Sequence, residues 1–388
     1  MKKLFPFNKD LGILSFTLFL LVLELNCKAQ NWSYKSIPAS YLPTTANLSS
    51  YQLKANSAKA GAYDLTQSLP SGYVTDGSVD YTQYLQKGIN SNHNVVFPNF
   101  PVLINDKGLA LTSNSTVIFN AKSKLILLPT AVGNYHILGI YDISNVKVYF
   151  PVIQGDRVKH TGTVGEWGMG IAIQGSSDIQ IFNPKISNCW GDGIYIGKSK
   201  TASKNIYIAY AQCDNNRRNG ISIVSVDSLN LIHPLVSNIN GTEPMAGIDI
   251  EPNGNSDNVD DINIDRPITF NSKRGILLVL LALPGPQAKQ VNIKINDHLD
   301  DQSITGFHYS GLKKTYNGSV LNGSVKIINP VWKKNVTPFG HPGSYDFGPQ
   351  ITFSNVSIID KDGKNVAQKG VLDKIKKDLN SESKVSIR

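Results

Sequence analysis

Three acidic residues in the middle of the chain are the strongest candidates for acid–base chemistry. Asp249 and Glu251 alternate with aliphatic residues, and Asp192 begins a similar segment earlier in the chain. Residues two apart on a strand share a face about 6.5–7 Å apart, and carboxyls separated by about 6.5–9.5 Å suit the acid and base of an inverting glycosidase. We therefore expect Asp249 and Glu251 to be catalytic, with a sugar and a water between them and with Asp192 assisting.

Two arginines and three aromatic residues near these acids could bind a substrate. Arg217 and Arg218 come between the acids in the sequence, and a guanidinium can hold a carboxylate through two hydrogen bonds. Trp167 and Trp190 each come shortly before a segment of alternating aliphatic residues, and Tyr195 lies within such a segment. We expect all five to contact substrate, although a tryptophan at such a place can stack on a sugar ring or simply cover a corner of the core.

A polar loop earlier in the chain adds three further candidates. It contains Asp156, Arg157 and His160, and we expect their side chains to reach the same groove. His160 could act there as a base, and the alternative is a histidine that is merely exposed. The sequence contains no Cys/His cluster at the spacing of a zinc site, so the identity of any metal stays open.

These residues are positioned by a repeat in which a glycine precedes alternating aliphatic residues. The glycines are Gly170, Gly193, Gly220, Gly247 and Gly275. Their spacings are 23, 27, 27 and 28 residues. A recurrence at this period indicates a supersecondary unit stacked on its neighbours, and alternation with period two indicates strands. The isoleucines should therefore point inward, and the residues between them should form columns on one outer face.

A second repeat, out of phase with the first, consists of alternating aliphatic residues followed by a proline. Examples are residues 179–181 before Pro184 and residues 229–231 before Pro234. Each turn of the chain thus supplies at least two strands, with Pro or Gly at the corners. Neither the blade length of a propeller nor the pattern of a leucine-rich repeat fits. We expect an all-β, single-domain, right-handed parallel β-helix over residues 71–360, with an enlarged loop at residues 240–244.

The segments outside the repeats have different roles. Residues 1–29 have the charge and apolar run of a secretory signal peptide, which places the mature protein outside the cell or in the periplasm. Cleavage is expected near Ala29, and lipid attachment at Cys27 is the alternative. No later segment has the length of a membrane span.

Three further segments flank or cap the predicted solenoid. Residues 30–70 are expected to be extended. Residues 80–91 have the apolar spacing of a short helix, which would cap the first coil, because an uncapped solenoid exposes its core. Residues 361–388 are polar and lysine-rich, and we expect a helix or a loose tail there.

The composition narrows the classes of partner. The chain of 388 residues has a formal net charge of +9, which favours acidic partners, although a basic surface also simply aids solubility. Basic patches with interleaved aromatic residues are absent, so no nucleic-acid partner is expected. Coil alignment places Cys213 beside Ile186 and three residues out of register with Cys189, so we expect no disulfide. The oligomeric state stays open.

The opening of the repeat region resembles the pectate-lyase-like β-helix proteins. The matching residues are Asp76-Gly77, Asp80, Thr82, Gln86 and Val96-Phe97-Pro98. Within that group, Gly191-Asp192-Gly193 is similar to the Gly-Asp-Asp coil of polygalacturonase-type glycoside hydrolases, and Asn219-Gly220 is similar to their Gly-His-Gly coil. The resemblance implies a secreted protein that acts on a polysaccharide, often one rich in uronic acid.

Three hypotheses follow for the function. The first is an enzyme that cleaves glycosidic bonds of an acidic polysaccharide, with hydrolysis slightly favoured over β-elimination. An eliminating lyase would use Ca²⁺ held by the acids, whereas no cofactor is firmly implied for hydrolysis. The second is a non-catalytic glycan-binding protein that uses the same groove. The third is a structural solenoid, for which the apolar residues 277–283 could form an interface.

Overall fold

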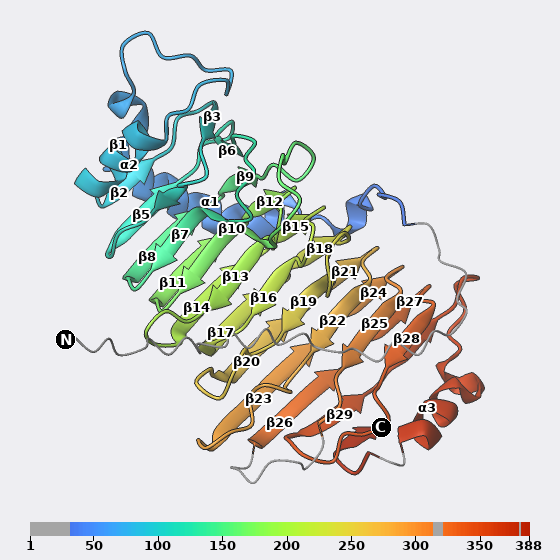
Figure 1. Cartoon of the computed structure of the whole chain (residues 1–388). Coiled ribbons are helices and arrows are strands. Elements are labelled where there is room, and N and C mark those ends of the chain that lie inside the picture. The colour runs from blue at the N-terminus through green and yellow to red at the C-terminus, as the bar shows by residue number, and fades with distance from the viewer. Residues whose placement is uncertain (1–31, 313–320, 380–381) are drawn as a thin grey trace, which may run out of the picture. The chain divides into compact units, whose positions relative to one another are not determined.

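The computed structural model describes residues 32–312, 321–379 and 382–388. Tyr34–Arg388 forms one compact unit. In its described part, the chain winds as a right-handed parallel β-helix of about 10 turns, whose strands stack into three sheets (Figure 1). The prediction of an all-β parallel β-helix is confirmed.

The three sheets contain 12, 10 and 9 strands within the described residues. The first sheet consists of β1 (Tyr63–Asp64), β2 (Asn94–Val96), β5 (Ser115–Ile118), β8 (Ser144–Tyr149), β11 (Ser177–Phe182), β14 (Ser203–Ala209), β17 (Val226–Ile232), β20 (Val259–Asp265), β23 (Lys289–Asn296), β26 (Leu321–Ile328), β29 (Gln350–Ser354) and β31 (Val385–Ile387). The second consists of β3 (Pro101–Ile104), β6 (Lys124–Leu127), β9 (Val152–Gln154), β12 (Lys185–Ser187), β15 (Gln212–Asp214), β18 (Leu235–Ser237), β21 (Ile268–Phe270), β24 (Leu299–Asp301), β27 (Val331–Lys333) and β30 (Ser357–Ile359). The third consists of β4 (Leu109–Ala110), β7 (Asn134–Tyr141), β10 (Trp167–Gln174), β13 (Ile194–Gly197), β16 (Ile221–Ile223), β19 (Ala246–Ile250), β22 (Arg274–Leu278), β25 (Thr305–Tyr309) and β28 (Thr337–Gly340).

The glycine repeat forms the third sheet, with the register that the period predicts. Ile194 pairs with Ile221, Ile221 with Ile248, and Ile248 with Ile276. All four are fully buried in the interior of the solenoid. Burial of one such side chain stabilises the fold by about 1.5–3 kcal/mol, so the column of isoleucines fixes which residues face outward.

The repeated glycines allow successive coils to approach closely. A Cβ at Gly193 would lie 2.7 Å from the carbonyl oxygen of Gly220, and one at Gly220 would lie 2.6 Å from that of Gly247. A Cβ at Gly247 would lie 2.6 Å from the carbonyl oxygen of Gly275. A side chain at any of these positions would push neighbouring coils apart, which explains why the glycine recurs with every coil.

Asparagine occupies one of the corners, where the sequence analysis expects Pro or Gly. Asn188, Asn215, Asn238 and Asn271 follow strands of the second sheet and have φ between 50° and 58°. Asparagine tolerates this left-handed conformation better than most residues because its short side chain bonds locally. The Nδ2 of Asn215 also donates to Oδ1 of Asn188 at 2.7 Å, so the corner residues bond from coil to coil.

The predicted capping helix is present as α2 (Thr82–Ser91). It follows a short 3-10 helix, η2 (Leu65–Ser68). Leu85 and Ile89 on α2 are buried against the first coil, and Asp80 Oδ1 accepts a hydrogen bond from the backbone N–H of Thr82 at 2.9 Å. The helix thus covers apolar side chains that an open solenoid end would expose.

Residues 30–70 are not simply extended, because they contain η1 (Ala39–Tyr41) and the 15-residue helix α1 (Thr45–Lys59). The side chains and backbones of Thr44 and Asn47 cap the start of α1 reciprocally. Tyr51 stacks on Phe182 at 4.7 Å between ring centroids. α1 therefore packs on outward-facing aromatic residues of the first sheet.

The C-terminal segment is more ordered than a polar tail. A π-helical turn (Ala367–Val371) leads into α3 (Leu372–Asp378), which agrees with the expected helix. β31 then adds to the first sheet, where Val385 pairs with Ile351 and Ile387 pairs with Phe353. The solenoid does not end at residue 360, because Val385 and Ile387 alternate and are buried.

Other expectations concern the N-terminus, membrane spans and cysteines. The predicted signal peptide, with Ala29 and Cys27, lies outside the described residues. Among the residues that the structure places, no helix combines the length and hydrophobicity needed to cross a membrane. Cys189 and Cys213 are buried free thiols, and Cys213 pairs with Ile186 as the coil alignment predicts.

Candidate active site

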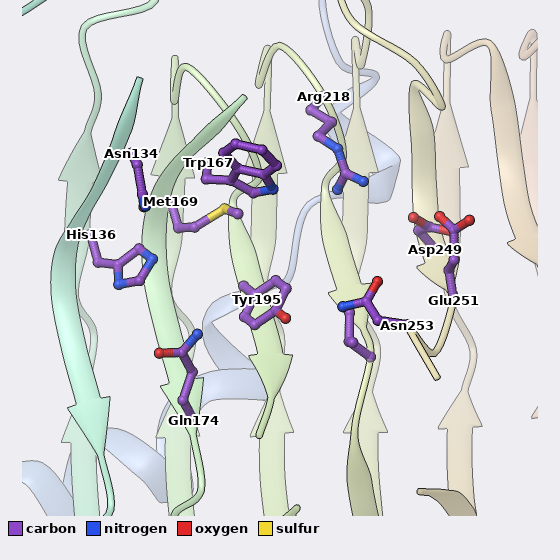
Figure 2. A pocket seen from close by; sticks show the side chains of 11 residues that line it. Asn134, His136, Trp167, Met169, Gln174, Tyr195, Arg218, Asp249, Glu251 and Asn253 are labelled. Atoms are coloured by element: carbon purple, nitrogen blue, oxygen red, sulfur yellow. The ribbon is translucent and has the colours of Figure 1, made fainter. Parts of the chain in front are cut away.

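An open polar pocket of about 380 Å³ lies on the outer face of the third sheet (Figure 2). We call it the carboxyl pocket. Its lining residues are Asn134, His136, Trp167, Met169, Gln174, Tyr195, Arg218, Val224, Asp249, Glu251 and Asn253. They come from the coils of β7 to β19, four strand spacings or about 19 Å along the solenoid. Such a length suits several units of a polymer rather than one small molecule.

Strand pairing builds the predicted outer column. Tyr195 pairs with Ser222, and Ser222 pairs with Asp249. The ring of Tyr195 lies across Gly197, where a Cβ would be 2.5 Å from the ring. The ring therefore lies along the sheet surface and forms part of the pocket floor.

The carboxyl groups of Asp249 and Glu251 lie side by side at one end of the pocket (Figure 2), close enough for each to perturb the pKa of the other. Burial and the adjacent Glu251 raise the pKa of Asp249 well above its ordinary value, and burial also raises the pKa of Glu251. Two carboxylates in contact do not both ionise readily, so the pair keeps one proton up to a higher pH than an isolated carboxyl would. Oδ1 of Asp249 is buried and has no hydrogen-bond donor in the described structure, which fits an oxygen that carries this proton.

The expected gap between Asp249 and Glu251 is absent. The prediction assumed the regular spacing of residues two apart on a strand. β19 ends at Ile250, so Glu251 lies beyond the strand, and its side chain contacts Asp249. No sugar and water fit between two carboxyls that lie side by side.

Asp192 is buried behind the pocket at the centre of a polar network. It accepts hydrogen bonds from Ser222 Oγ at 2.8 Å and from the backbone N–H of Asn219 at 3.1 Å. Nη1 of Arg218 donates to it at 3.1 Å. Nδ2 of Asn219 donates to Ser222 Oγ at 3.0 Å and to Asp249 Oδ2 at 2.9 Å. Asp192 therefore does not line the pocket but positions the groups that do.

Arg218 brings a positive charge to the edge of this network. Burial lowers its pKa, but Asp192 and the other nearby acids raise it more, so the guanidinium stays charged. Burial raises the pKa of Asp192, and Arg218 opposes that rise. Glu166 lies on the other side, 3.8 Å from Nε of Arg218. The hydrogen bonds to Asp192 use Nη1 alone, so Arg218 can also face an anion in the pocket.

The opposite end of the pocket carries groups suited to binding. Nδ1 of His136 lies 2.6 Å from the hydroxyl of Tyr141, and burial lowers the pKa of His136, so its imidazole is neutral near pH 7. Trp167 is 50% exposed at the rim. Figure 2 shows Asn134 beside these residues. A flat aromatic face and neutral polar groups are typical of a surface that binds sugar rings.

Trp190, Arg217 and His160 form a stack outside the carboxyl pocket. The rings of His160 and Trp190 are stacked at 3.8 Å between centroids. The guanidinium of Arg217 lies 3.7 Å from the Trp190 ring and donates to the carbonyl of Gly165 at 2.9 Å. None of the three lines the carboxyl pocket, because their side chains pack against one another and against the backbone near Gly165.

Asp156 and Arg157 do not reach the pocket either. Asp156 is 3% exposed, and it accepts a hydrogen bond from the Tyr135 hydroxyl at 2.5 Å and lies 2.8 Å from Nδ1 of His160. Nη2 of Arg157 donates to the carbonyl of Asn240 at 2.6 Å. Their polar groups thus anchor the predicted polar loop and the enlarged loop at residues 240–244 to the solenoid.

The sequence analysis assigned no role to three residues that complete the site. Asn219 precedes Gly220 as Asp192 precedes Gly193, and this shared position was the available signal. Ser222 lies between Ile221 and Ile223, so the repeat predicts it in the outer column, but nothing in the sequence indicated a function for it. His136 was hidden because its coil is offset from the next by 33 residues, as the pairing of Asn134 with Trp167 shows, and not by 27.

This arrangement can transfer protons on one face of a bound sugar. The acid pair holds one proton and one negative charge, and Arg218 can neutralise an acidic group nearby. Within the part of the chain that the structure describes, no group of three or more His, Cys, Asp or Glu side chains is arranged to hold a metal ion. No ligands for Ca²⁺ are therefore assigned here.

Sequence comparisons find relatives of undescribed function. No protein-family model matches. Two Bacillus subtilis (strain 168) proteins are similar: the uncharacterized protein YclG, 26% identical over 233 residues that cover 52% of this chain and 39% of YclG, and the SPbeta prophage-derived uncharacterized protein YorA, 27% identical over 165 residues that cover 38% of this chain and 28% of YorA. The chain thus spans about two fifths or less of the curated relatives it matches.

Two solved structures resemble the fold. The mannuronan C-5 epimerase AlgE4 A-module of Azotobacter vinelandii has a TM-score of 0.53 and 12% identity, and the match covers 78% of this chain and 89% of that chain. The endo-xylogalacturonan hydrolase of Aspergillus tubingensis has a TM-score of 0.52 and 11% identity, with 75% and 82% covered. At these identities the likeness shows the shared β-helix fold.

Proposed function

We propose that the chain is a carbohydrate-active enzyme that cleaves an acidic polysaccharide in the carboxyl pocket by β-elimination. The observation that carries the proposal is the contact between Asp249 and Glu251 beside the guanidinium of Arg218. Flanking carboxyls in glycosidases lie about 5–5.5 Å apart in retaining enzymes and further apart in inverting ones. Two adjacent carboxyls on one face suit a reaction that removes and returns a proton on that same face.

The proposed step balances within the pair. The ionised Glu251 takes the proton from the sugar carbon next to the carboxylate, and the electron pair forms a double bond to the adjacent carbon. The bond from that carbon to the glycosidic oxygen breaks, and Asp249 gives its proton to the departing oxygen. Glu251 then holds a proton and Asp249 is ionised, and proton transfer between the two adjacent carboxyls restores the starting state.

Arg218 supports this step through its charge. Removal of the proton builds negative charge on the carboxylate of the sugar, and a fixed guanidinium stabilises that charge as it develops. Asp192 holds Arg218 from behind at 3.1 Å. Tyr195, Trp167 and His136 would bind neighbouring sugars along the pocket.

Hydrolysis is the second candidate, because the fold is shared with an endo-xylogalacturonan hydrolase at a TM-score of 0.52. The other neighbour is named a mannuronan C-5 epimerase. C-5 is also the sugar carbon from which the proposed elimination would take its proton. Polysaccharide is thus the substrate class that both fold neighbours support.

Incubation with a panel of uronic-acid polysaccharides, with and without chelator, tests the proposal. Elimination yields an unsaturated product that absorbs in the ultraviolet, whereas hydrolysis yields reducing ends without it. Exchange of sugar hydrogen for deuterium without cleavage would indicate epimerisation instead. Absence of all three signals, together with measurable glycan binding, would favour a binding protein and contradict the proposal.

We further propose that the protein is exported, on the basis of the charged and apolar pattern of residues 1–29. N-terminal sequencing of protein recovered from the medium or periplasm should begin at Gln30. A lipid-modified Cys27 at the N-terminus would support the alternative route.

A further inference from the structure

A second polar cleft of about 370 Å³ lies beside α1, away from the carboxyl pocket. We call it the α1 cleft. Its lining residues are Gln52, Asn56, Lys59, Ile118, Phe119, Asn120, Ala121, Phe150, Val152, Asn183 and Lys185. They come from α1 and from the corner between the first and second sheets, so the cleft exists because α1 packs on the solenoid. Its volume is within the usual range for ligand sites.

The α1 cleft is cationic. Lys59 donates to the amide oxygen of Asn120 at 2.6 Å, so a neutral group and not a carboxylate holds it. Lys185 is exposed, and its ammonium takes part in no ion pair or hydrogen bond among the described residues. No acidic side chain is among the lining residues. The two charges are therefore available to an anionic ligand, with little competition from the protein.

A buried amide faces the same cleft. Asn183 is only 4% exposed, and its Oδ1 accepts a hydrogen bond from Nε2 of Gln212 at 2.8 Å. None of the hydrogen bonds in the described structure uses its Nδ2. The buried side-chain atoms that lack a partner do not include this nitrogen, so it is open to the cleft, where a ligand oxygen could accept its hydrogen bond.

The lining also contains the groups that bind sugars. Gln52 and Asn56 offer amides to hydroxyl groups, and the half-buried ring of Phe150 offers an apolar face. The lining contains no carboxyl, imidazole or thiol in the described residues, so the cleft has no counterpart of the acid pair in the carboxyl pocket.

We propose that the α1 cleft is a second, non-catalytic site that binds a segment of an acidic polysaccharide. The proposal rests on the proposed function only in taking saccharide as the ligand class. A polymer held at the α1 cleft would stay near the enzyme between cleavage events. The shared chemistry is an anionic group on a sugar ring, and either a uronate or a sulfate ester could supply it.

Calorimetric titration of the Glu251→Gln chain tests the proposal, because this chain should bind without turnover. The probes are oligosaccharides of equal length that carry uronates, sulfates or no charge. With an acidic probe, we expect a binding event that the Lys59→Gln/Lys185→Gln pair of substitutions weakens by about tenfold, since each exposed charge contributes up to about 1 kcal/mol. The matched control, Lys294→Gln/Lys326→Gln, removes the same charge elsewhere and should leave that event unchanged. Comparison of the uronate and sulfate probes shows which of the two anionic groups the α1 cleft binds.

Asn183→Asp provides a second variant that preserves shape. It keeps the oxygen that Gln212 bonds and tolerates the left-handed backbone, but it places a negative charge in the cleft. We expect it to abolish the second binding event while the melting temperature changes little. Equal binding by the lysine variants, equal binding of the neutral probe, or binding of anionic lipid vesicles in place of the acidic oligosaccharides would overturn the proposal. Each readout is binding by an inactive chain, so a failure of the proposed reaction would leave this test intact.

Discussion

At the scale of single residues, the close approach of Asp249 and Glu251 determines which chemistry the pocket can perform. We expect Glu251→Gln and Asp249→Asn each to lower kcat/KM on the true substrate by about 10²–10⁴, because each removes one partner in proton transfer. Steady-state assays on the polysaccharide measure the effect. Asp261→Asn, at an exposed acid elsewhere, is the control. Full activity in either pocket variant would contradict the assignment.

The same pair predicts a bell-shaped dependence of kcat/KM on pH. At low pH both carboxyls are protonated and no base remains, and at high pH Asp249 loses its proton and no acid remains. Since burial raises the pKa of both groups, the alkaline limb should lie above the ordinary carboxyl range. In Asp249→Asn, the residual activity should lose its alkaline limb and keep its acid limb. An unchanged profile would show that other groups titrate.

Residue types and spacing in the sequence were sufficient to place Asp249, Glu251, Arg218, Tyr195 and Trp167 around one pocket. They did not place Trp190 or His160 correctly. A tryptophan that binds sugar and one that covers the core look alike in a sequence, and so do a catalytic and a structural histidine. Asn219 was overlooked because an amide attracts little notice as a catalytic group. Its importance lies in a hydrogen bond to Asp249 across neighbouring coils, which only coordinates reveal.

At the scale of elements, the repeated glycine sets the spacing of the coils. A Cβ at Gly220 would lie 2.0 Å from a methyl of Val236 and 2.6 Å from the carbonyl of Gly247. We therefore expect Gly220→Ala to destabilise the protein by about 1–3 kcal/mol through overpacking, as measured by denaturant unfolding. Gly254→Ala, where no heavy atom lies within 4 Å, should change stability by less than about 0.5 kcal/mol. Similar values for the two variants would argue against the glycine column.

The elements that were predicted and those that were not differ in their apolar pattern. The strands alternate with a strict period, so their existence, register and inward face follow from the sequence. In α1, the only buried residue is Ala55, so the helix lacks the apolar stripe from which a helix can be predicted. β31 is three residues long, and two apolar side chains are too few to predict a strand without knowing that β29 lies beside them.

At the scale of the whole molecule, a buried acid makes stability depend on pH. Burial raises the pKa of Asp300 to about 7, although Thr269 Oγ1 donates to its Oδ2 at 2.6 Å. A carboxyl whose pKa is higher in the folded state binds more protons when folded, so its contribution to stability falls as pH rises between about 4 and 7. The effect then levels off, because both states are ionised above that range.

Asp300→Asn isolates this contribution. The amide can donate to Thr269 while the hydroxyl of Thr269 turns to His298, whose Nε2 is 2.8 Å away. We expect the free energy of unfolding of the variant, relative to the parent, to rise by about 1–4 kcal/mol between pH 4 and 7. Denaturant titrations across this range measure it. A difference that stays constant with pH would mean that Asp300 is ionised throughout.

The carboxyl pocket draws its lining from Asn134 to Asn253, so five consecutive coils must stack before it exists. A nascent chain that ended before Glu251 would carry the aromatic rim without the acid pair. A chain truncated there would lack the complete pair of carboxyls, so the proposed reaction requires all the coils from β7 to β19 together.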